Sequence, residues 1–165
     1  MDINAVVAAL RRACPDRDIE SRAAPVADTF VTLPPDCVPA AVALLIEQFD
    51  VYHLSTITGQ DTGTEIELLY HFWGGSGLTL RTHLPREHPH IATMTDLIPI
   101  ADFYEREVWE MLGVEFDGHP NLRPLLLPDD WDAEPPLRQR PTPAASQTSG
   151  DGGGRGDEEV QEEDQ

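Results

Sequence analysis

Asp102–Trp131 is the most distinctive stretch of this chain, and it reads DFYEREVWEMLGVEFDGHPNLRPLLLPDDW. Its first half predicts a helix, because Pro99 blocks helical continuation from upstream and Gly113 suits a left-handed helix end. We expect Asp102 to cap or charge the first turn. The face that packs on a core is predicted by one apolar stripe at helical spacing, formed by Tyr104, Val108, Met111 and Leu112.

The opposite face of this helix is expected to be charged and exposed. Asp102 and Arg106 are spaced i, i+4 in the favourable order, so we expect an ion pair between them. Glu105 and Glu107 are two residues apart and point in different directions on a helix, so they do not form a paired-carboxylate site. These spacings make Arg106 the expected centre of the ion pairs.

The second half of the stretch is rich in glycine and proline. Its prolines remove backbone donors and disfavour a helix or a central strand, so we expect the chain to run extended across a surface. His119, set between Gly118 and Pro120, is expected to fix a turn by hydrogen bonding. Apolar side chains in such a segment are usually buried against something, another protein being one possibility, and here they are Leu122, Leu125, Leu126, Leu127 and Trp131.

Many residues of this stretch together resemble the signature of a known family. They are Glu105-Arg106-Glu107-Val108, Gly113, Phe116, Gly118-His119-Pro120, Leu122-Arg123, Pro128-Asp129-Asp130-Trp131 and Pro136-Leu137-Arg138. In order and spacing the set is similar to the thirty-kilodalton hydrophilic subunit of respiratory complex I, the NADH:quinone oxidoreductase. Related subunits occur in energy-converting membrane-bound nickel-iron hydrogenases.

The resemblance implies a non-catalytic subunit that scaffolds its neighbours. The implied partners are the large subunit, which forms the quinone chamber or the nickel-iron site, and the small iron-sulfur subunit. Iron-sulfur clusters, FMN, NADH and quinone would belong to those neighbours, as would electron transfer coupled to proton translocation. No catalytic, cofactor or metal residue is implied on this chain, and the partner-binding or signature residues are Glu105, Arg106, Glu107, Gly113, Gly118, His119, Pro120, Arg123, Pro128, Asp129, Asp130, Trp131 and Arg138.

Departures from the family pattern leave two branches open. Glu110 stands where respiratory members usually have aspartate, Pro124 replaces the second arginine of a usual pair, and Gln139-Arg140 replaces a Lys-Asp-Tyr ending. These changes make the hydrogenase branch the alternative. The complex I type is preferred because Gly118-His119-Pro120 and Pro128–Trp131 are retained entire.

Composition excludes several classes of protein. The 165 residues suit one domain, and a net charge of -19 argues against nucleic acid and anionic lipid as direct partners. No apolar run approaches the roughly 18 to 20 residues that span a bilayer, and no targeting segment is expected. We therefore expect a soluble, peripheral protein on the cytoplasmic side of the cell membrane, attached through partners. Cys14 and Cys37 lack the spacing of a zinc or iron-sulfur site and predict two buried or idle thiols.

Periodicity predicts an α+β domain over residues 1–100, with helices packed on one face of a mainly antiparallel or mixed sheet. We expect helices over residues 2–13 and 38–49, and strands over residues 18–24, 27–33, 51–58, 65–73 and 78–84. The loop Gly74–Gly77 joins two strand patterns, so it is interpreted as a hairpin rather than a phosphate cradle. Residues 101–140 add the signature helix and an extended proline-rich arm to the same domain, and residues 141–165 predict a disordered acidic tail.

Two further classes compete with the scaffold hypothesis. His83, His88 and His90 lie within eight residues of one another and could bind zinc in a stand-alone metal-binding protein. A stand-alone acidic interaction module is the other class, and it predicts that deletion of residues 141–165 abolishes binding.

Overall fold

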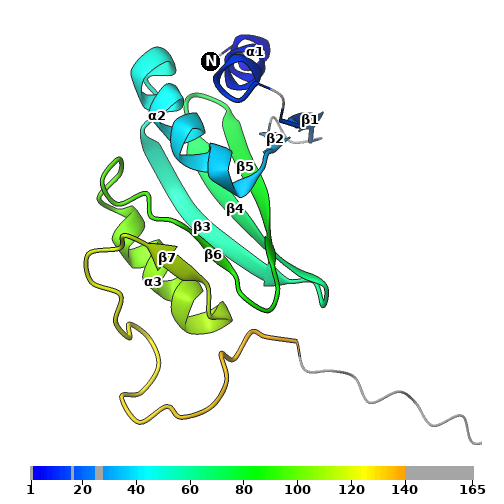
Figure 1. Ribbon diagram of the computed structural model, residues 1–165. Coiled ribbons are helices and arrows are strands. Elements are labelled where there is room, and N and C mark those ends of the chain that lie inside the picture. Colours follow the sequence, from blue (N-terminus) through cyan, green and yellow to red (C-terminus); the bar gives the residue numbers. More distant parts are fainter. Residues whose placement is uncertain (1, 16, 25–27, 140–165) are drawn as a thin grey trace, which may run out of the picture.

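The computed structural model describes residues 2–15, 17–24 and 28–139. In chain order the elements are α1 (Ile3–Ala13), β1 (Glu20–Ala23), β2 (Asp28–Thr32), the 3₁₀ turn η1 (Pro35–Cys37), α2 (Val38–Phe49), β3 (His53–Asp61), β4 (Glu65–Trp73), β5 (Gly77–Pro85), β6 (His90–Ala92), α3 (Ala101–Leu112) and β7 (Glu115–Asp117). Figure 1 shows α2 and α3 packed against the sheet and a long segment leaving β7. The predicted α+β class is confirmed, whereas the predicted acidic tail lies outside the described residues.

The main sheet has the strand order β1-β2-β5-β4-β3. β3, β4 and β5 pair antiparallel as consecutive hairpins, β2 joins β5 in parallel, and β1 lies antiparallel to β2. Trp73 pairs with Gly77 across the glycine-rich loop, which confirms the predicted hairpin. β3 runs past its expected end at residue 58, because residues 59–61 continue to pair with residues 66–68 of β4.

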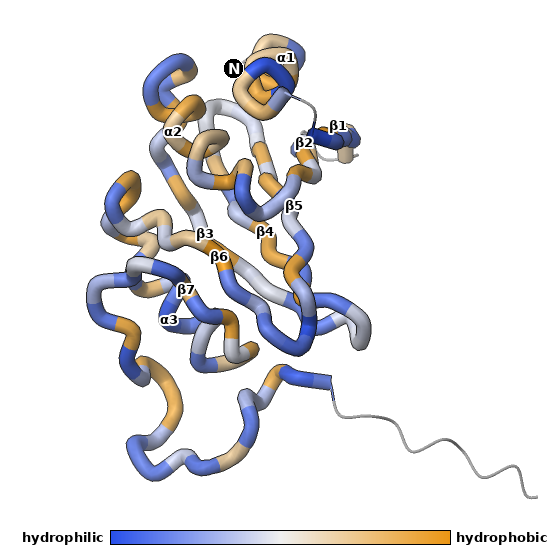
Figure 2. The backbone as a smooth tube through the Cα atoms, viewed as in Figure 1, coloured by the Kyte–Doolittle hydropathy of each residue, from blue (hydrophilic) through white to orange (hydrophobic). Residues whose placement is uncertain are grey.

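The core lies on one face of this sheet. Along β4 the side chains of Ile66, Leu68, Tyr70 and Phe72 are buried and alternate with half-buried side chains of the other face. Figure 2 shows hydrophobic residues on β4 and β5 where α2 crosses the sheet, and an alternation of hydrophobic and hydrophilic stretches after β7. Both cysteines join the core; burial and the neighbouring Cys14 thiol raise the pKa of Cys37 to about 12.

Gly59 lets α3 approach β3 closely. A Cβ atom on Gly59 would lie 2.4 Å from Cδ1 of Leu112, a distance that real Cβ atoms do not show. The helix ends at Gly113, whose φ of +69° is the predicted left-handed exit. Asp102 lies in the first turn of α3, but no side chain caps the N-terminus of this helix. Asp102 therefore contributes negative charge to the first turn and does not act as the cap.

β6 and β7 form a short parallel pair that the sequence patterns do not predict. Ile91 lies opposite Phe116, and α3 connects the two strands. Three residues are too few for a period-two pattern, so this βαβ unit has no recognisable signature in the sequence. The pairing of β6 with β7 fixes the position of the end of α3 and of the segment that follows β7.

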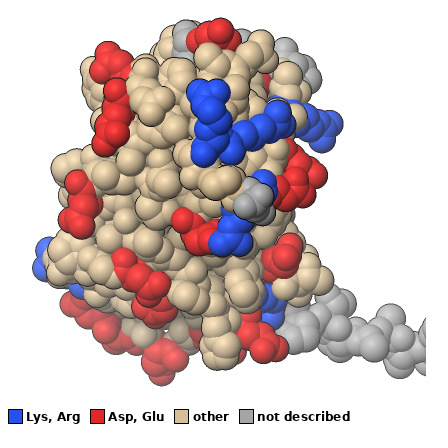
Figure 3. All heavy atoms as spheres, turned by 45° about the horizontal axis from the view of Figure 1, so that its top comes forward, with Lys and Arg blue, Asp and Glu red and all other residues tan. Residues whose placement is uncertain are grey.

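Acidic residues outnumber basic residues in this chain by 30 to 11. Figure 3 shows one face, on which the basic side chains gather toward the upper part and acidic side chains are distributed around them. None of the helices in the described part of the chain has the length and apolar character needed to span a bilayer.

Candidate functional site

The signature helix α3 buries charge instead of exposing it. The exposed fractions of Glu105, Arg106 and Glu110 are only 0%, 6% and 8%. The expectation of an exposed charged face is therefore wrong for Glu105 and Arg106, although Glu107 is exposed as expected. A buried charge is tolerated only where hydrogen bonds replace water, so the partners of these side chains define the site.

Glu110 binds the backbone of the arm, the name used here for residues 118–139. Its carboxylate accepts hydrogen bonds from the N–H groups of Leu125, Leu126 and Leu127 at 3.1, 2.8 and 3.0 Å. Burial alone would raise the pKa of Glu110, but these three donors and the nearby Arg106 lower it below its usual value. The glutamate that departs from the family pattern is thus satisfied entirely within this chain.

Arg106 holds the segment just before these leucines. Its Nε and Nη2 donate to the carbonyl oxygens of Arg123 and Pro124 at 3.0 and 2.8 Å. Its Nη1 lies 3.6 Å from Asp102, which confirms the predicted i, i+4 pair. Nε and Nη2 of Arg106 are thus bonded to the arm within the described chain, and the predicted role of Arg106 in binding a partner stays a prediction.

Glu105 binds the loop before α3 and lies beside the root of the arm. Its carboxyl group accepts from the N–H of Met94 at 2.6 Å and contacts Thr93 Oγ1 at 2.5 Å. His119 Nε2 lies 4.0 Å from Glu105, and His119 Nδ1 accepts from the N–H of Asn121 at 3.0 Å, which confirms its predicted role in a turn. Burial raises the pKa of Glu105 to about 7, against the lowering effect of its two donors.

The far end of the arm is anchored on β3 by residues that the sequence did not single out. Asp61 accepts from Nε of Arg86 at 2.9 Å and from the N–H of Gln139 at 2.9 Å. Burial would raise the pKa of Asp61, but Arg86 and the N–H groups of Gly63 and Gln139 lower it to about 2. Arg138 Nη1 adds a bond to the carbonyl of Arg86 at 2.7 Å. Asp61 lies beyond the expected end of its strand at residue 58, where nothing in the sequence marks it as an anchor.

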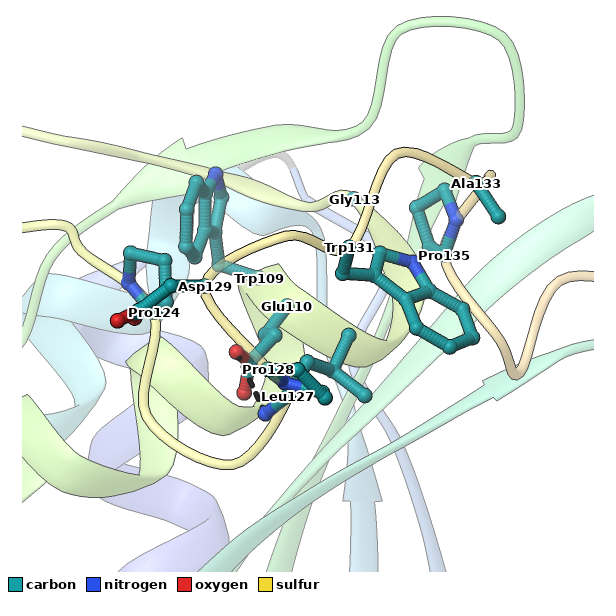
Figure 4. A pocket seen from close by; sticks show the side chains of 10 residues that line it. All are labelled: Trp109, Glu110, Gly113, Pro124, Leu127, Pro128, Asp129, Trp131, Ala133 and Pro135. Carbon is teal, nitrogen blue, oxygen red and sulfur yellow. Dashed lines mark hydrogen bonds between the residues drawn. The ribbon is translucent and has the colours of Figure 1, made fainter.

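Between α3 and the arm lies an open cavity of about 240 Å³. Figure 4 shows Trp109 and Trp131 on its border and the Glu110 carboxylate turned toward the arm. Its lining is mostly apolar and comprises Trp109, Glu110, Gly113, Pro124, Leu127, Pro128, Asp129, Trp131, Ala133 and Pro135. The internal hydrogen bonds of the arm therefore leave apolar groups at the surface: Trp131 is 45% and Leu126 60% exposed.

The predicted residues divide into two groups. Those held inside the fold include Glu105, Arg106, Gly113, His119 and Arg138. Those exposed on the surface of the arm are Gly118, Pro120, Arg123, Pro128, Asp129, Asp130 and Trp131, and Glu107 is exposed on α3. The first group fixes the conformation of the arm, and the second is what the arm presents.

The three histidines proposed as a metal site do not form one. His83 Nδ1 lies 3.5 Å from Glu65, and His90 Nδ1 lies 3.0 Å from Asp117. Across residues 2–15, 17–24 and 28–139, no group of three or more potential metal ligands comes together. This geometry contradicts the hypothesis of a metal-binding protein built on these histidines.

The fold and the site define a small α+β domain whose C-terminal arm is fixed by buried charges of one helix. The family described as the 30-kilodalton subunit of respiratory-chain NADH dehydrogenase matches residues 31–146, which include the main sheet from β2's last residues onward, α3 and the arm. The chain belongs to this family, as its signature residues predicted.

Curated relatives agree with this assignment. The C subunit of NADH-quinone oxidoreductase from Acidothermus cellulolyticus is 41% identical over 87 residues, which make up 49% of this chain and 44% of that protein. Its counterpart in Moorella thermoacetica is 31% identical over 131 residues, 76% of this chain and 86% of that protein. The C/D subunit of Klebsiella pneumoniae is 43% identical over 67 residues, 41% of this chain and 11% of that protein. The matched stretch thus spans less than half of two of these relatives.

A solved structure shares the fold. The trypsin-resistant fragment of Nqo5 superimposes with a TM-score of 0.61 at 28% identity, covering 74% of this chain and all of that fragment (100%).

Proposed function

We propose that this chain is a non-catalytic scaffold subunit of a complex-I-type NADH:quinone oxidoreductase. In this proposal it binds the large subunit, and next to it the small iron-sulfur subunit. Iron-sulfur clusters, FMN, NADH and quinone are held by neighbouring subunits, and the membrane is reached through partners on its cytoplasmic side. Family membership supports the type of complex, and the combined C/D name of one relative supports direct contact with the large subunit.

The proposal is supported by the structure of the arm. Internal hydrogen bonds hold its backbone, and apolar side chains are exposed on its surface. Its backbone is bonded to Glu110, Arg106 and Asp61, so it loses little conformational entropy when a partner binds. Trp131, together with the cavity that it borders, offers an aromatic anchor, and the exposed Arg123 offers forked donors for a carboxylate. We place the contact with the large subunit on this surface.

The test is purification of the tagged full chain from gently solubilised membranes, with quantification of the subunits recovered with it. Trp131→Ala and Arg123→Ala are expected to lower recovery of the large subunit about tenfold or more each, as for interface anchors worth about 1.4 kcal/mol or more.

The matched control is Trp73→Ala, since Trp73 is 57% exposed at the end of β4 and outside the arm. It should leave recovery unchanged. Assembly that survives both arm substitutions would rule out the arm as the contact surface, and recovery of the native chain alone would rule out the scaffold role.

A further inference from the structure

His119 has its proton on one defined nitrogen. Nδ1 accepts a hydrogen bond from the N–H of Asn121 at 3.0 Å, so it carries no proton, and the ring proton is on Nε2. This Nε2–H is buried, with its side chain 1% exposed, and points between two carboxyl groups. It lies 3.4 Å from Asp102 Oδ1 and 4.0 Å from Glu105 Oε2, and among the described residues it completes a hydrogen bond with neither.

Glu105 is surrounded by neutral groups and one negative charge. Its hydrogen-bonding contacts are the hydroxyl of Thr93 and the N–H of Met94, while Asp102 faces it from its own helix. Arg106, the adjacent cation, is turned to Asp102 and to the arm carbonyls. From β4, the buried hydroxyl of Tyr70 also interacts with Glu105, and it has no hydrogen-bond partner in the described part of the chain.

We propose that Glu105 is a proton-holding switch, and that loss of its proton draws the Nε2–H of His119 into a hydrogen bond with Glu105 and thereby shifts the root of the arm. The proposal concerns the chain itself and does not depend on what the arm contacts.

The two states differ in which hydrogen bonds they contain. The hydroxyl of Thr93 donates to Oε2 of ionised Glu105; when that oxygen is protonated the bond reverses, so that Glu105 donates to Thr93 Oγ1 and the Thr93 hydrogen turns to Thr95 Oγ1 at 2.9 Å. When ionised, Glu105 can only accept, and the Nε2–H of His119 is an unsatisfied buried donor 4.0 Å from its Oε2. Because His119 and Asn121 are bonded through Nδ1, movement of the ring displaces the turn that begins the arm.

Electrostatics places this equilibrium close to neutral pH. Burial, and to a lesser degree the charge of Asp102, raise the pKa of Glu105 to about 7, although Thr93 and Met94 lower it. An acid whose pKa is raised by folding destabilises the native state as pH rises from its unfolded value toward its folded value. Burial of Glu105 therefore lowers the free energy of unfolding only slightly at acid pH and most strongly above pH 7.

The first experiment compares unfolding of the native full chain with Glu105→Gln, which keeps shape and hydrogen bonds but cannot ionise. The unfolding constant of the native protein, divided by that of the variant, is expected to rise about 30-fold between pH 5.5 and 8.5. The reason is that folding raises the pKa of Glu105 from 4.5 to about 7. Glu107→Gln, an exposed neighbour on the same helix, is the matched control and should show no such rise. An equal ratio at both pH values for Glu105→Gln would overturn the proposal.

The second experiment follows the switch directly by nuclear magnetic resonance. The nitrogen shifts of the His119 ring should report a proton on Nε2, and the amide of Asn121 should shift with a midpoint near pH 7. In Glu105→Gln this shift should disappear while the ring tautomer stays the same. A proton on Nδ1, or an Asn121 shift that persists in the variant, would show that Glu105 does not move His119.

Discussion

Buried carboxylates of this protein bind backbone amides from distant parts of the chain. Glu110 accepts three successive N–H groups, and Asp61 accepts that of Gln139, which is 78 residues away. Amide donors are present at every residue except proline, so a single carboxylate can hold an irregular segment whatever its side chains. This explains how a proline-rich arm, which cannot form a helix or a central strand, keeps one conformation.

Glu110→Gln tests that explanation at the level of one residue. The amide has one acceptor oxygen instead of two and no charge, so we expect a loss of about 2 kcal/mol in the free energy of unfolding at pH 7. Urea denaturation measures it, with the exposed Glu115→Gln as a control.

The pH dependence has a defined sign. Folding lowers the pKa of Glu110, so its stabilisation is present above the unfolded value of 4.5 and is lost as pH falls through the lower folded value. The difference in the free energy of unfolding between the native protein and Glu110→Gln should therefore become smaller as the pH falls. A difference in the free energy of unfolding that becomes larger at low pH would show that folding does not lower the pKa of Glu110.

Sequence spacing predicted contacts between residues close to each other in the chain but not the contacts between α3 and the arm. The pair of Asp102 with Arg106 and the turn at His119 follow from residues within four positions of each other. The bonds from Arg106 to the carbonyls of Arg123 and Pro124 do not, because a carbonyl acceptor leaves no trace in residue identity. Burial of Glu105 escaped prediction because one of its partners, the N–H of Met94, is also a backbone group.

Among the elements, those with local stop signals and clear periodicity were predicted best. α3 ends at Gly113 as expected, and α1, α2, β4 and β5 lie within about two residues of their predicted bounds. β6 and β7 were missed because their pairing depends on α3 bringing two three-residue segments together. Tertiary contact, and not local propensity, creates such strands.

A pair of glycine substitutions separates backbone strain from packing of the arm. Gly113 and Gly75 have φ of +69° and +85°, so alanine at either should cost about 1 kcal/mol through backbone strain. At Gly113 the added Cβ would also lie 3.2 Å from Cγ of Pro135, whereas at Gly75 it meets nothing within 4 Å. We expect Gly113→Ala to destabilise the protein by about 1 kcal/mol more than Gly75→Ala in chemical denaturation. Equal losses would mean that the arm is not packed on the helix end.

For the whole molecule, charge opposes folding. The net charge is -19 for 165 residues, and residues 141–165 contribute seven acids and one arginine to it. Repulsion among like charges destabilises a compact state, and salt screens it. We expect the melting temperature to rise between about 20 mM and 500 mM sodium chloride. The rise should be smaller for residues 1–140, and a melting temperature that falls with salt would mean that favourable ion pairs dominate instead.

The parallel pairing of β2 with β5 in the main sheet has a consequence for the order of folding. β3, β4 and β5 are neighbours in sequence and in space, so their two hairpins close short loops and can form early. β2 must wait for β5, since Asp28 pairs with Gly77. The bond from Asp61 to Gln139 closes a longer loop still. On a ribosome, where the arm is synthesised after the sheet, strands β2 to β5 can be paired before the arm emerges to be bound.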